Sequence, residues 1–323
     1  MFRLLIVFSL FYPFSLCAEV WVSAQQSVMG TLIRAEVSAR DQMAGERAIA
    51  QVFDEMHRID RQMSPYKPRS ELSQVNRLAS RSPVSISTEL FGLLQRSVEV
   101  SVLSAGSFDI TYASAGKLYN YRQAKGPTAT ELIKVLRAIN YRHLQLDSQA
   151  VSVYFKQPGV SIDLGGIAKG HAVDRAIARL QAIGIEHAMV AAGGDSRFIG
   201  QRDGGPWVIG IKDPRQRDAV IARLPLTDLA ISTSGDYERF FIRDGERFHH
   251  ILNPSNGTSA KGLRSVSVLG PEATMTDALA TAVFVMGLKK GMELINSLEL
   301  YDAVLVGKSG SLHFTDQLVS AVK

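Results

Sequence analysis

The sequence predicts an α+β fold with mixed, largely antiparallel sheets, built as a single globular unit. Helix-like and strand-like segments alternate irregularly, and several neighbouring strand-like segments have no helix between them. Parallel strands need a long crossover connection, usually a helix, so strands that follow one another directly are expected to pair antiparallel. The chain has 323 residues and 46% apolar content, enough for a sizeable core, and no internal repeat or long linker divides it.

The spacing of apolar residues predicts the helices. Several segments repeat apolar residues every three or four positions, as the buried face of a helix does. Segment 169–183, for example, places Ala172, Val173, Ala176 and Leu180 on one face. Helices are expected at 46–63, 89–103, 130–139, 169–183, 276–288 and 290–297.

Short segments rich in β-branched and other apolar residues predict the strands, because Gly, Pro or Asp bounds them. Segment 31–38 alternates apolar and polar residues, as a half-buried strand does. Further strands are expected at 151–155, 160–164, 188–192, 207–212, 229–233, 264–269 and 302–306.

Residues 1–18 are expected to be a signal peptide outside the folded unit. Arg3 precedes an apolar run, and small residues follow around Cys17 and Ala18. A membrane anchor is the alternative, but polar residues and a proline interrupt the run, which is shorter than the roughly 20 residues of a spanning helix. Lipid attachment at Cys17 is a second alternative, which the bulky Leu16 before it disfavours.

Charge and cysteine content exclude several classes of function. Cleavage near Ala18 leaves a domain over 19–323 without cysteine, which excludes disulfides, thiolate metal sites and cysteine nucleophiles. The net charge of +5 becomes +4 without Arg3, and the pI near 9.3 permits weak attraction to anionic ligands or membrane surfaces. Lys and Arg are scattered and no zinc-finger or RNP-like pattern accompanies them, so no nucleic acid is expected as a partner.

The glycine-rich segment 162–170, IDLGGIAKG, is the strongest local signal for chemistry. A predicted strand enters a glycine turn that opens a predicted helix. Glycines let the backbone approach a ligand, a helix N-terminus offers N–H groups to a phosphate, and Lys169 adds a full positive charge. The spacing matches neither Walker A nor G-x-G-x-x-G, so taken alone the segment is equally consistent with a purely structural turn.

A second candidate site lies on the helix predicted at 276–288. Asp277 and Thr281 stand four residues apart and share a helix face. A carboxylate, a hydroxyl and nearby carbonyls suit Mg²⁺, which often completes its coordination shell with phosphate and water. Thr274 and Asp277 also have the spacing of a capping box, so a helix cap is the alternative.

A third group of polar residues lies at predicted strand ends, with Asp236 in one segment and His249 and His250 in another. Adjacent residues of a strand point to opposite faces, so at most one histidine is expected in a given pocket. An ordinary surface or core histidine is the alternative for each. Ser234 lacks the G-x-S-x-G turn of a serine-hydrolase nucleophile. The turn that contains Phe108 is either structural or supplies an aromatic wall beside a planar ring.

Taken together and in this order, these segments resemble the ApbE family of FAD:protein FMN transferases over nearly the whole domain. The ordered set is far more specific than any single member. The resemblance implies an ApbE-like, T-fold-related structure. The matching segments are 29–31, 63–66, 70–76, 107–111, 163–174, 193–195, 213–214, 234–237, 250–254 and 277–281.

The resemblance implies one site for FAD and one for Mg²⁺. The residues that would line the FAD site are Met29, Tyr66, Ser107, Phe108, Asp109, Asp163, Lys169 and Ile251. Those that would surround Mg²⁺ are Gly166 and Ala280, through their carbonyls, with Asp277 and Thr281. The chain departs from the usual pattern at His171, which replaces a frequent Tyr, at Thr276, which replaces a frequent Ala, and at 112–116, which lacks the usual Gly-Pro. These departures leave fine contacts and target choice open.

The implied reaction is magnesium-dependent transfer of FMN from FAD to a Thr or Ser hydroxyl of an acceptor flavoprotein, with release of AMP. Mg²⁺ and Lys169 would offset the negative charge of the diphosphate. His250 is the first candidate for the base, because an imidazole takes a proton near neutral pH, and Asp236 is its rival or orienting partner. Two alternatives stay open, a magnesium-dependent FAD pyrophosphatase that uses water as the nucleophile and a flavin-binding carrier without catalysis.

The resemblance also implies where the protein works. Acceptors are expected among flavin-carrying subunits of membrane electron-transfer complexes, or extracytoplasmic flavoproteins, with a short motif around the modified Thr or Ser. With the signal peptide, this predicts a periplasmic enzyme, and association with the inner membrane is left open. The sequence does not indicate the oligomeric state.

Overall fold

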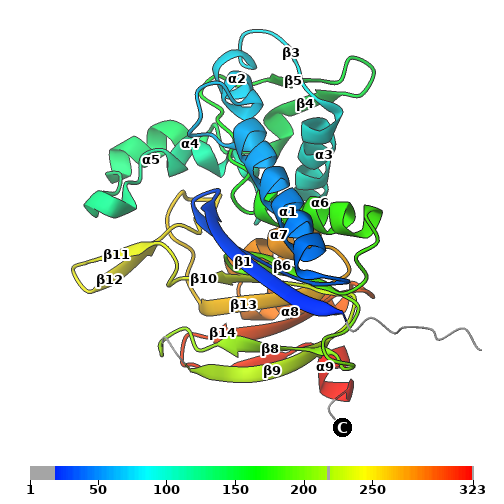
Figure 1. Cartoon of the computed structure of the whole chain (residues 1–323). Helices are drawn as coiled ribbons and strands as arrows, with labels where there is room; N and C mark the ends of the chain where they lie inside the picture. The colour runs from blue at the N-terminus through cyan, green and yellow to red at the C-terminus, as the bar shows by residue number, and fades with distance from the viewer. Residues whose placement is uncertain (1–18, 217–218, 322–323) are drawn as a thin grey trace, which may run out of the picture.

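An eight-stranded antiparallel sheet forms the centre of the molecule in the computed structural model, which describes residues 19–216 and 219–321 (Figure 1). Every neighbouring pair in the order β1-β2-β6-β7-β10-β13-β14-β15 is antiparallel. The predicted α+β class and antiparallel pairing are thereby confirmed. The expected signal peptide lies outside the described residues. The strands are β1 Val20–Val28, β2 Thr31–Ala39, β6 Ala188–Ala192, β7 Asp195–Ile199, β10 Ala230–Gly235, β13 Leu263–Gly270, β14 Asp302–Gly307 and β15 Leu312–Phe314.

Helices cover one face of this sheet. Helix α1 (Gln42–Met63) packs on β1, β2 and α6, and α6 (Ala168–Ala182) packs in turn on α7. Helix α7 (Ala273–Met286) lies over β10 and β13. Helix α8 (Leu288–Asn296) packs on α7 and β14, and α3 (Thr88–Leu103) packs on α7 from the side away from the sheet (Figure 1).

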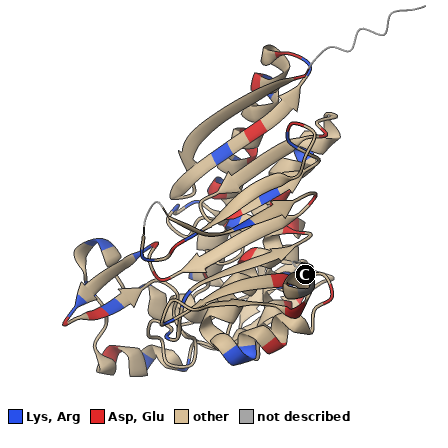
Figure 2. Ribbon diagram, turned by 90° about the horizontal axis from the view of Figure 1, so that it is seen from below, with Lys and Arg blue, Asp and Glu red and all other residues tan. Residues whose placement is uncertain are grey.

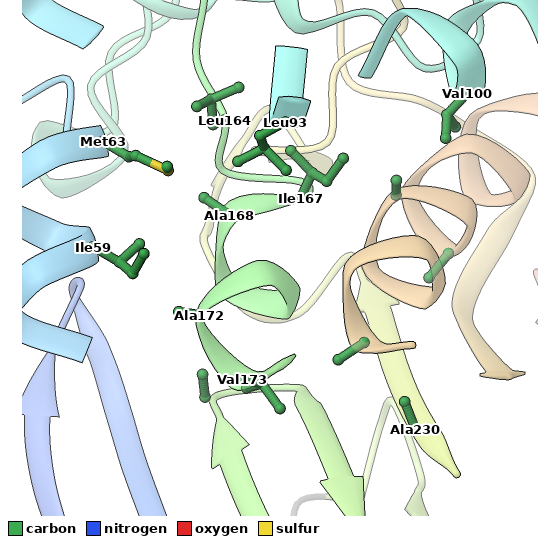
Figure 3. Close-up of a cluster of buried hydrophobic side chains, with 14 of the residues drawn as sticks. Ile59, Met63, Leu93, Val100, Leu164, Ile167, Ala168, Ala172, Val173 and Ala230 are labelled. Carbon is green, nitrogen blue, oxygen red and sulfur yellow. The ribbon is translucent and has the colours of Figure 1, made fainter. Parts of the chain in front are cut away.

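The main core fixes the start of α6 between α1 and α7. Ile59 and Met63 of α1 lie on one side of the segment that leads into α6, and Leu93 of α3 lies above it (Figure 3). Leu164 and Ile167, which flank the two glycines of the turn, are almost completely buried in this cluster. Burying such side chains contributes about 1.5–3 kcal/mol each, so the core holds the glycine turn in a fixed position.

The opposite face of the sheet is covered by a β-hairpin of β8 (Trp207–Lys212) and β9 (Val220–Leu226). Trp207 and Leu226 of this hairpin pack on Phe198, Ile231 and other sheet residues in a second, smaller core. The sheet therefore has apolar contacts on both faces, which explains why its middle strands are buried on both sides.

The remaining elements lie around the edges. A small sheet of order β3-β5-β4 lies beyond α3, and the hairpin of β11 and β12 projects from the body beside α5 (Figure 1). Their bounds are α2 Glu71–Leu78, β3 Val84–Ser85, α4 Ala113–Gly116, α5 Ala129–Leu136, β4 Leu144–Asp147, β5 Ser152–Phe155, β11 Phe240–Arg243, β12 Glu246–His249 and α9 Asp316–Ala321, with 3₁₀ turns at Ile110–Tyr112, Tyr121–Gln123 and Tyr141–His143.

All six predicted helices are present, with ends shifted by up to four residues, but the predicted strand at 160–164 is wrong. The segment has no strand partner, because side chains take the backbone groups that a neighbouring strand would bind. The Asn76 side chain both donates to the Ile162 carbonyl (2.9 Å) and accepts from the Ile162 N–H (2.8 Å), and the Ser161 N–H donates to Ser114 Oγ. The apolar residues of 160–164 therefore indicate that the segment is buried, not that it belongs to a sheet.

Basic and acidic residues are interspersed along the ribbon (Figure 2). Within the described ranges, no helix combines the length and the apolar content needed to cross a bilayer.

Candidate active site

The glycine turn, the start of α6 and the first half of α7 meet at one place. Gly170 is the contact point, because a Cβ on this residue would lie 2.1 Å from the Ala273 carbonyl oxygen. Helix α7 begins there because Asp174 of α6 accepts hydrogen bonds from the N–H groups of Ala273 (2.9 Å) and Thr274 (2.8 Å). A carboxylate at the first N–H groups of a helix satisfies donors that have no partner within the helix.

This contact shows that the capping-box alternative for Asp277 is wrong. Helix α7 begins at Ala273, one turn before Asp277, and its cap comes from Asp174. The Asp277 carboxylate is instead turned toward α6, where it accepts from the Gly170 N–H (3.2 Å) and from Lys169 Nζ (3.2 and 3.3 Å).

Lys169 lies between two buried carboxylates. Its ammonium contacts Asp277 and also Asp195, whose side chains are only 4% and 2% exposed. Burial and the neighbouring Asp195 raise the pKa of Asp277, whereas Lys169 opposes the rise. Burial would lower the pKa of Lys169, but the two carboxylates outweigh it and raise the pKa. The ammonium therefore stays charged at the base of the site.

Oxygen donors gather beside this cluster. Thr281, one helical turn after Asp277, lies 3.2 Å from Ser234 Oγ of β10. A Cβ on Gly166 would lie 3.2 Å from Thr281 Oγ1 and 3.3 Å from the Phe108 ring, so the glycine backbone packs closely against both side chains. Ala280 is fully buried next to Thr281 in α7. The structure thus brings together the four residues predicted for Mg²⁺, namely Gly166, Asp277, Ala280 and Thr281.

This donor set suits a hard cation with few protein ligands. One carboxylate, a hydroxyl and the backbone of the turn are oxygen donors of the kind that Mg²⁺ accepts when phosphate and water complete its shell. Within the ranges 19–216 and 219–321, no group of three or more His, Cys, Asp or Glu side chains is arranged to hold a metal. The carboxylates of Asp277 and Asp195 already bind one cation, the Lys169 ammonium.

Asp163 lies at the entrance to the glycine turn. Its Oδ1 accepts from the Gly165 N–H (2.6 Å), and the buried hydroxyl of Tyr112 also donates to its carboxylate. Burial raises the pKa of Asp163, and these two donors oppose the rise. The positive charge of Arg239 also opposes the rise in the pKa of Asp163.

His250 follows directly after β12. Its backbone N–H donates to the Arg239 carbonyl (3.1 Å), and its Nδ1 is buried without a hydrogen-bond partner. Burial, and then the positive charges of Arg239, His249 and Lys169, lower the pKa of His250 to about 3. The imidazole is neutral at pH 7 and has a free nitrogen, as a proton acceptor requires.

The neighbouring histidine, His249, has a different environment. His249 is buried and its Nε2 is 2.8 Å from the Ala260 carbonyl, so it is a core residue. Asp236 is held by the guanidinium of Arg215, with distances of 2.7 and 2.6 Å to its two oxygens. Among the described residues, no hydrogen bond joins Asp236 to His250, so the structure does not bring these two candidates together.

The residues expected around FAD fall into two groups. Phe108 packs against Gly166, Ile251 is buried beside His250, and Met29 forms a left-handed turn (φ 56°) next to Gly30. Tyr66 is 82% exposed. Of these four residues, Phe108 adjoins the glycine turn and Ile251 adjoins His250.

The second group is tied to the protein's own backbone. Asp109 accepts from the N–H groups of Thr111 (2.8 Å) and Tyr141 (2.7 Å), which anchors two 3₁₀ turns. The N–H of Ser107 donates to the Ser104 carbonyl (3.0 Å). In this structure Asp109 supports the wall that carries Phe108.

Sequence reasoning gave no chemical role to three residues of this site. Asp195 holds Lys169, yet in the sequence it appears only within the matching segment 193–195 and has no role of its own. Tyr112 belongs to the segment that departs from the family pattern. Arg239 is an exposed arginine with no motif around it, so no sequence signal marks it.

Comparison with known proteins agrees with this arrangement. The sequence model of the ApbE family matches residues 29–305. An FAD:protein FMN transferase from Treponema pallidum is 32% identical over 305 residues, which cover 88% of this chain and 84% of the relative. Another from Klebsiella pneumoniae is 30% identical over 286 residues, which cover 87% of this chain and 88% of the relative.

Solved structures give the same result for the fold. The ApbE protein of Thermotoga maritima superposes with a TM-score of 0.87 at 34% identity, over 93% of this chain and 99% of the other. The flavin transferase ApbE of Vibrio cholerae superposes with a TM-score of 0.83 at 28% identity, over 94% and 99%. With most of its length matched in sequence and in structure, the chain belongs to the ApbE family.

Proposed function

We propose that this protein is an FAD:protein FMN transferase, which moves FMN from FAD onto a Thr or Ser hydroxyl of an acceptor flavoprotein and releases AMP. One observation carries the proposal: a charged lysine is held between two buried carboxylates beside a glycine turn, within electrostatic reach of a neutral, unpartnered imidazole. The family membership of the chain, and the names of its relatives, supply the substrate class.

Each group has a task that follows from its surroundings. Lys169 offsets the charge of the FAD diphosphate, because an ammonium in a partly buried site acts with little screening. The neutral His250 takes the proton of the acceptor hydroxyl. The acceptor oxygen forms a bond to the FMN-side phosphorus, the bond from that phosphorus to the AMP-side oxygen breaks, and AMP leaves with the displaced electron pair.

The low pKa of His250 is consistent with this task once substrate is bound. Two of its causes are the charges of Arg239 and Lys169. A bound diphosphate would neutralise both charges, which raises the pKa of the imidazole and makes it a stronger base.

We propose that Asp277, Thr281 and the carbonyls of Gly166 and Ala280 hold Mg²⁺. When bound, the ion supplies positive charge that stabilises the diphosphate and the leaving phosphate. The test needs no turnover: Mg²⁺ should raise the melting temperature of the wild type, and Asp277→Ala should abolish this rise. An equal rise in the variant would place the ion elsewhere.

Product analysis tests the function against hydrolysis. FAD and Mg²⁺ are incubated with the protein, with and without an acceptor flavoprotein, and the nucleotides are separated by chromatography. Transfer predicts AMP without a matching amount of free FMN, and only when acceptor is present. Equal amounts of free FMN and AMP in both samples would identify a pyrophosphatase, and no product in either would identify a flavin carrier.

We further propose that the enzyme acts outside the cytoplasm, on a flavin-carrying subunit of a membrane electron-transfer complex. The support is the signal-peptide pattern of residues 1–18 together with the requirement for an acceptor protein. Cell fractionation should find the full-length protein in the periplasm or at the outer face of the inner membrane. Recovery of the full-length protein from the cytosol would contradict this localisation.

A further inference from the structure

Arg239 lies on the solvent-facing side of the candidate site, in the turn between β10 and β11. The residue is exposed, but its backbone is fixed, because its carbonyl accepts the N–H of His250 at 3.1 Å. The arginine is thus held next to the candidate base, although the hairpin that follows it projects from the body (Figure 1).

The guanidinium of Arg239 contacts one part of the site and acts electrostatically on two others. Its Nη2 lies 3.4 Å from the Gly30 carbonyl, at the turn that carries Met29. Its positive charge also acts to lower the pKa of the Asp163 carboxyl group and the pKa of the His250 imidazole. The turn at 29–30, the segment at 163 and the segment at 250 are far apart in sequence, so Arg239 is positioned where they converge.

In the part of the chain that the structure describes, no carboxylate forms an ion pair with this guanidinium. Among the described residues, Arg239 forms no ion pair, and its side chain makes only the long contact to Gly30. By contrast, Arg215 pairs with Asp236 of the same turn at 2.6 Å, and Lys261 pairs with Glu246 of the hairpin at 2.6 Å. Arg243, farther along the hairpin, lies over the ring of Phe248, 4.7 Å from its centroid.

An arginine has five N–H donors in a planar fork that matches two oxygens of a phosphate. At Arg239 nearly all of these donors are free, and Lys169 supplies a second, partly buried cation to the same site. The ligand that fits between two cations is an anion with charge on adjacent groups.

We propose that Arg239 binds the diphosphate of FAD from the solvent side, while Lys169 binds it from the interior side. This inference rests on the proposed function, since it takes FAD as the substrate. Contact with the diphosphate would also remove the positive charge that Arg239 places beside His250. Arg239 is therefore a substrate-binding residue that also adjusts the pKa of His250, the candidate general base.

Equilibrium binding tests this role without any acceptor. Affinities for FAD, ADP and riboflavin are measured by calorimetry with Mg²⁺ for the wild type, Arg239→Gln, Arg239→Lys and the control Arg243→Gln. The control removes the same charge from an exposed position of the same hairpin. Thermal unfolding of each variant verifies that it is folded.

Loss of a charge-assisted contact predicts that Arg239→Gln weakens FAD and ADP binding by at least about tenfold, the equivalent of about 1.4 kcal/mol. Riboflavin, which has no phosphate, should bind unchanged. Arg239→Lys should recover part of the loss, and Arg243→Gln should bind all three ligands like the wild type.

Three results would overturn the inference. One is an unchanged affinity of Arg239→Gln for FAD. Another is an equal loss for FAD and riboflavin, which would indicate a structural role, and the third is the same loss in Arg243→Gln, which would indicate a general charge effect. Failure of the wild type to bind FAD would instead overturn the proposed function, so the two failures are distinguishable.

Discussion

Gly170→Ala is expected to separate α6 from α7 and to destabilise the protein. An added Cβ would lie 2.1 Å from the Ala273 oxygen, 2.5 Å from its carbonyl carbon and 2.9 Å from the Thr274 nitrogen. All three are backbone atoms, so no side chain can swing away, and α7 must move by more than 1 Å to restore ordinary contact.

That movement has two costs. Overpacking of a filled interior costs about 1–3 kcal/mol. The shift also stretches the bonds from the Ala273 and Thr274 N–H groups to Asp174, and losing such a cap costs about 1 kcal/mol. We expect Gly170→Ala to lower the free energy of unfolding by about 3–4 kcal/mol in total, since the upper part of the overpacking range applies to a backbone clash and the weakened cap adds to it.

Gly92→Ala provides the matched control. Gly92 also lies inside a helix, α3, and a Cβ there would meet nothing within 4 Å. Replacing an unconstrained helical glycine with alanine should raise the free energy of unfolding by up to about 1 kcal/mol. Urea unfolding followed by circular dichroism compares the two variants. Equal stability of Gly170→Ala and Gly92→Ala would refute the close packing of α6 on α7.

Two further predictions concern buried charge. Glu55 is fully buried in α1 with its carboxylate 2.7 Å from both Arg58 and Arg179, so Glu55→Gln should lower the free energy of unfolding by about 3 kcal/mol in urea titrations at pH 7. Burial opposes ionisation of Glu55, but the guanidiniums outweigh burial and lower the pKa of the carboxyl group below 4.5. The difference in free energy of unfolding between wild type and Glu55→Gln should therefore shrink as the pH falls below 4.5. A difference that stays constant with pH would contradict this. His250 has a folded-state pKa of about 3 against 6.5 for the ordinary side chain, so the unfolded state binds more protons between these values and stability falls as pH is lowered through that window. His250→Asn should lose less stability than the wild type between pH 7 and pH 5, and equal losses would show that the imidazole is not buried in this way.

Local patterns were sufficient for the helices and for the antiparallel pairing, because both depend on short-range periodicity and connection length. They failed at 160–164, where the apolar residues are buried but the polar backbone is bound by Asn76 and Ser114 from distant segments. The same limit applied to α7, whose cap is Asp174, almost 100 residues earlier in the chain.

The candidate site shows a similar division. Lys169, Asp277 and Thr281 were candidates because of their local motifs, but each motif alone left a structural alternative, and the ordered resemblance to the family gave these residues their expected roles. Asp195 and Arg239 could not be found in this way, because their importance comes from which residues the fold places beside them. Asp236 shows the same limit, because its carboxylate binds Arg215, a partner that its own segment does not indicate.

The central claim, that the site built by Lys169 and Asp277 transfers FMN to protein, is tested most directly by the intact mass of an acceptor flavoprotein. The acceptor is incubated with FAD, Mg²⁺ and either the wild type, Asp277→Ala or Asp54→Ala, an exposed aspartate of α1 that serves as the control. We expect the acceptor to gain the mass of one FMN group with the wild type and with Asp54→Ala, and to gain none with Asp277→Ala. An acceptor that gains no mass while FAD is consumed, or that gains FMN equally with Asp277→Ala, would contradict the account.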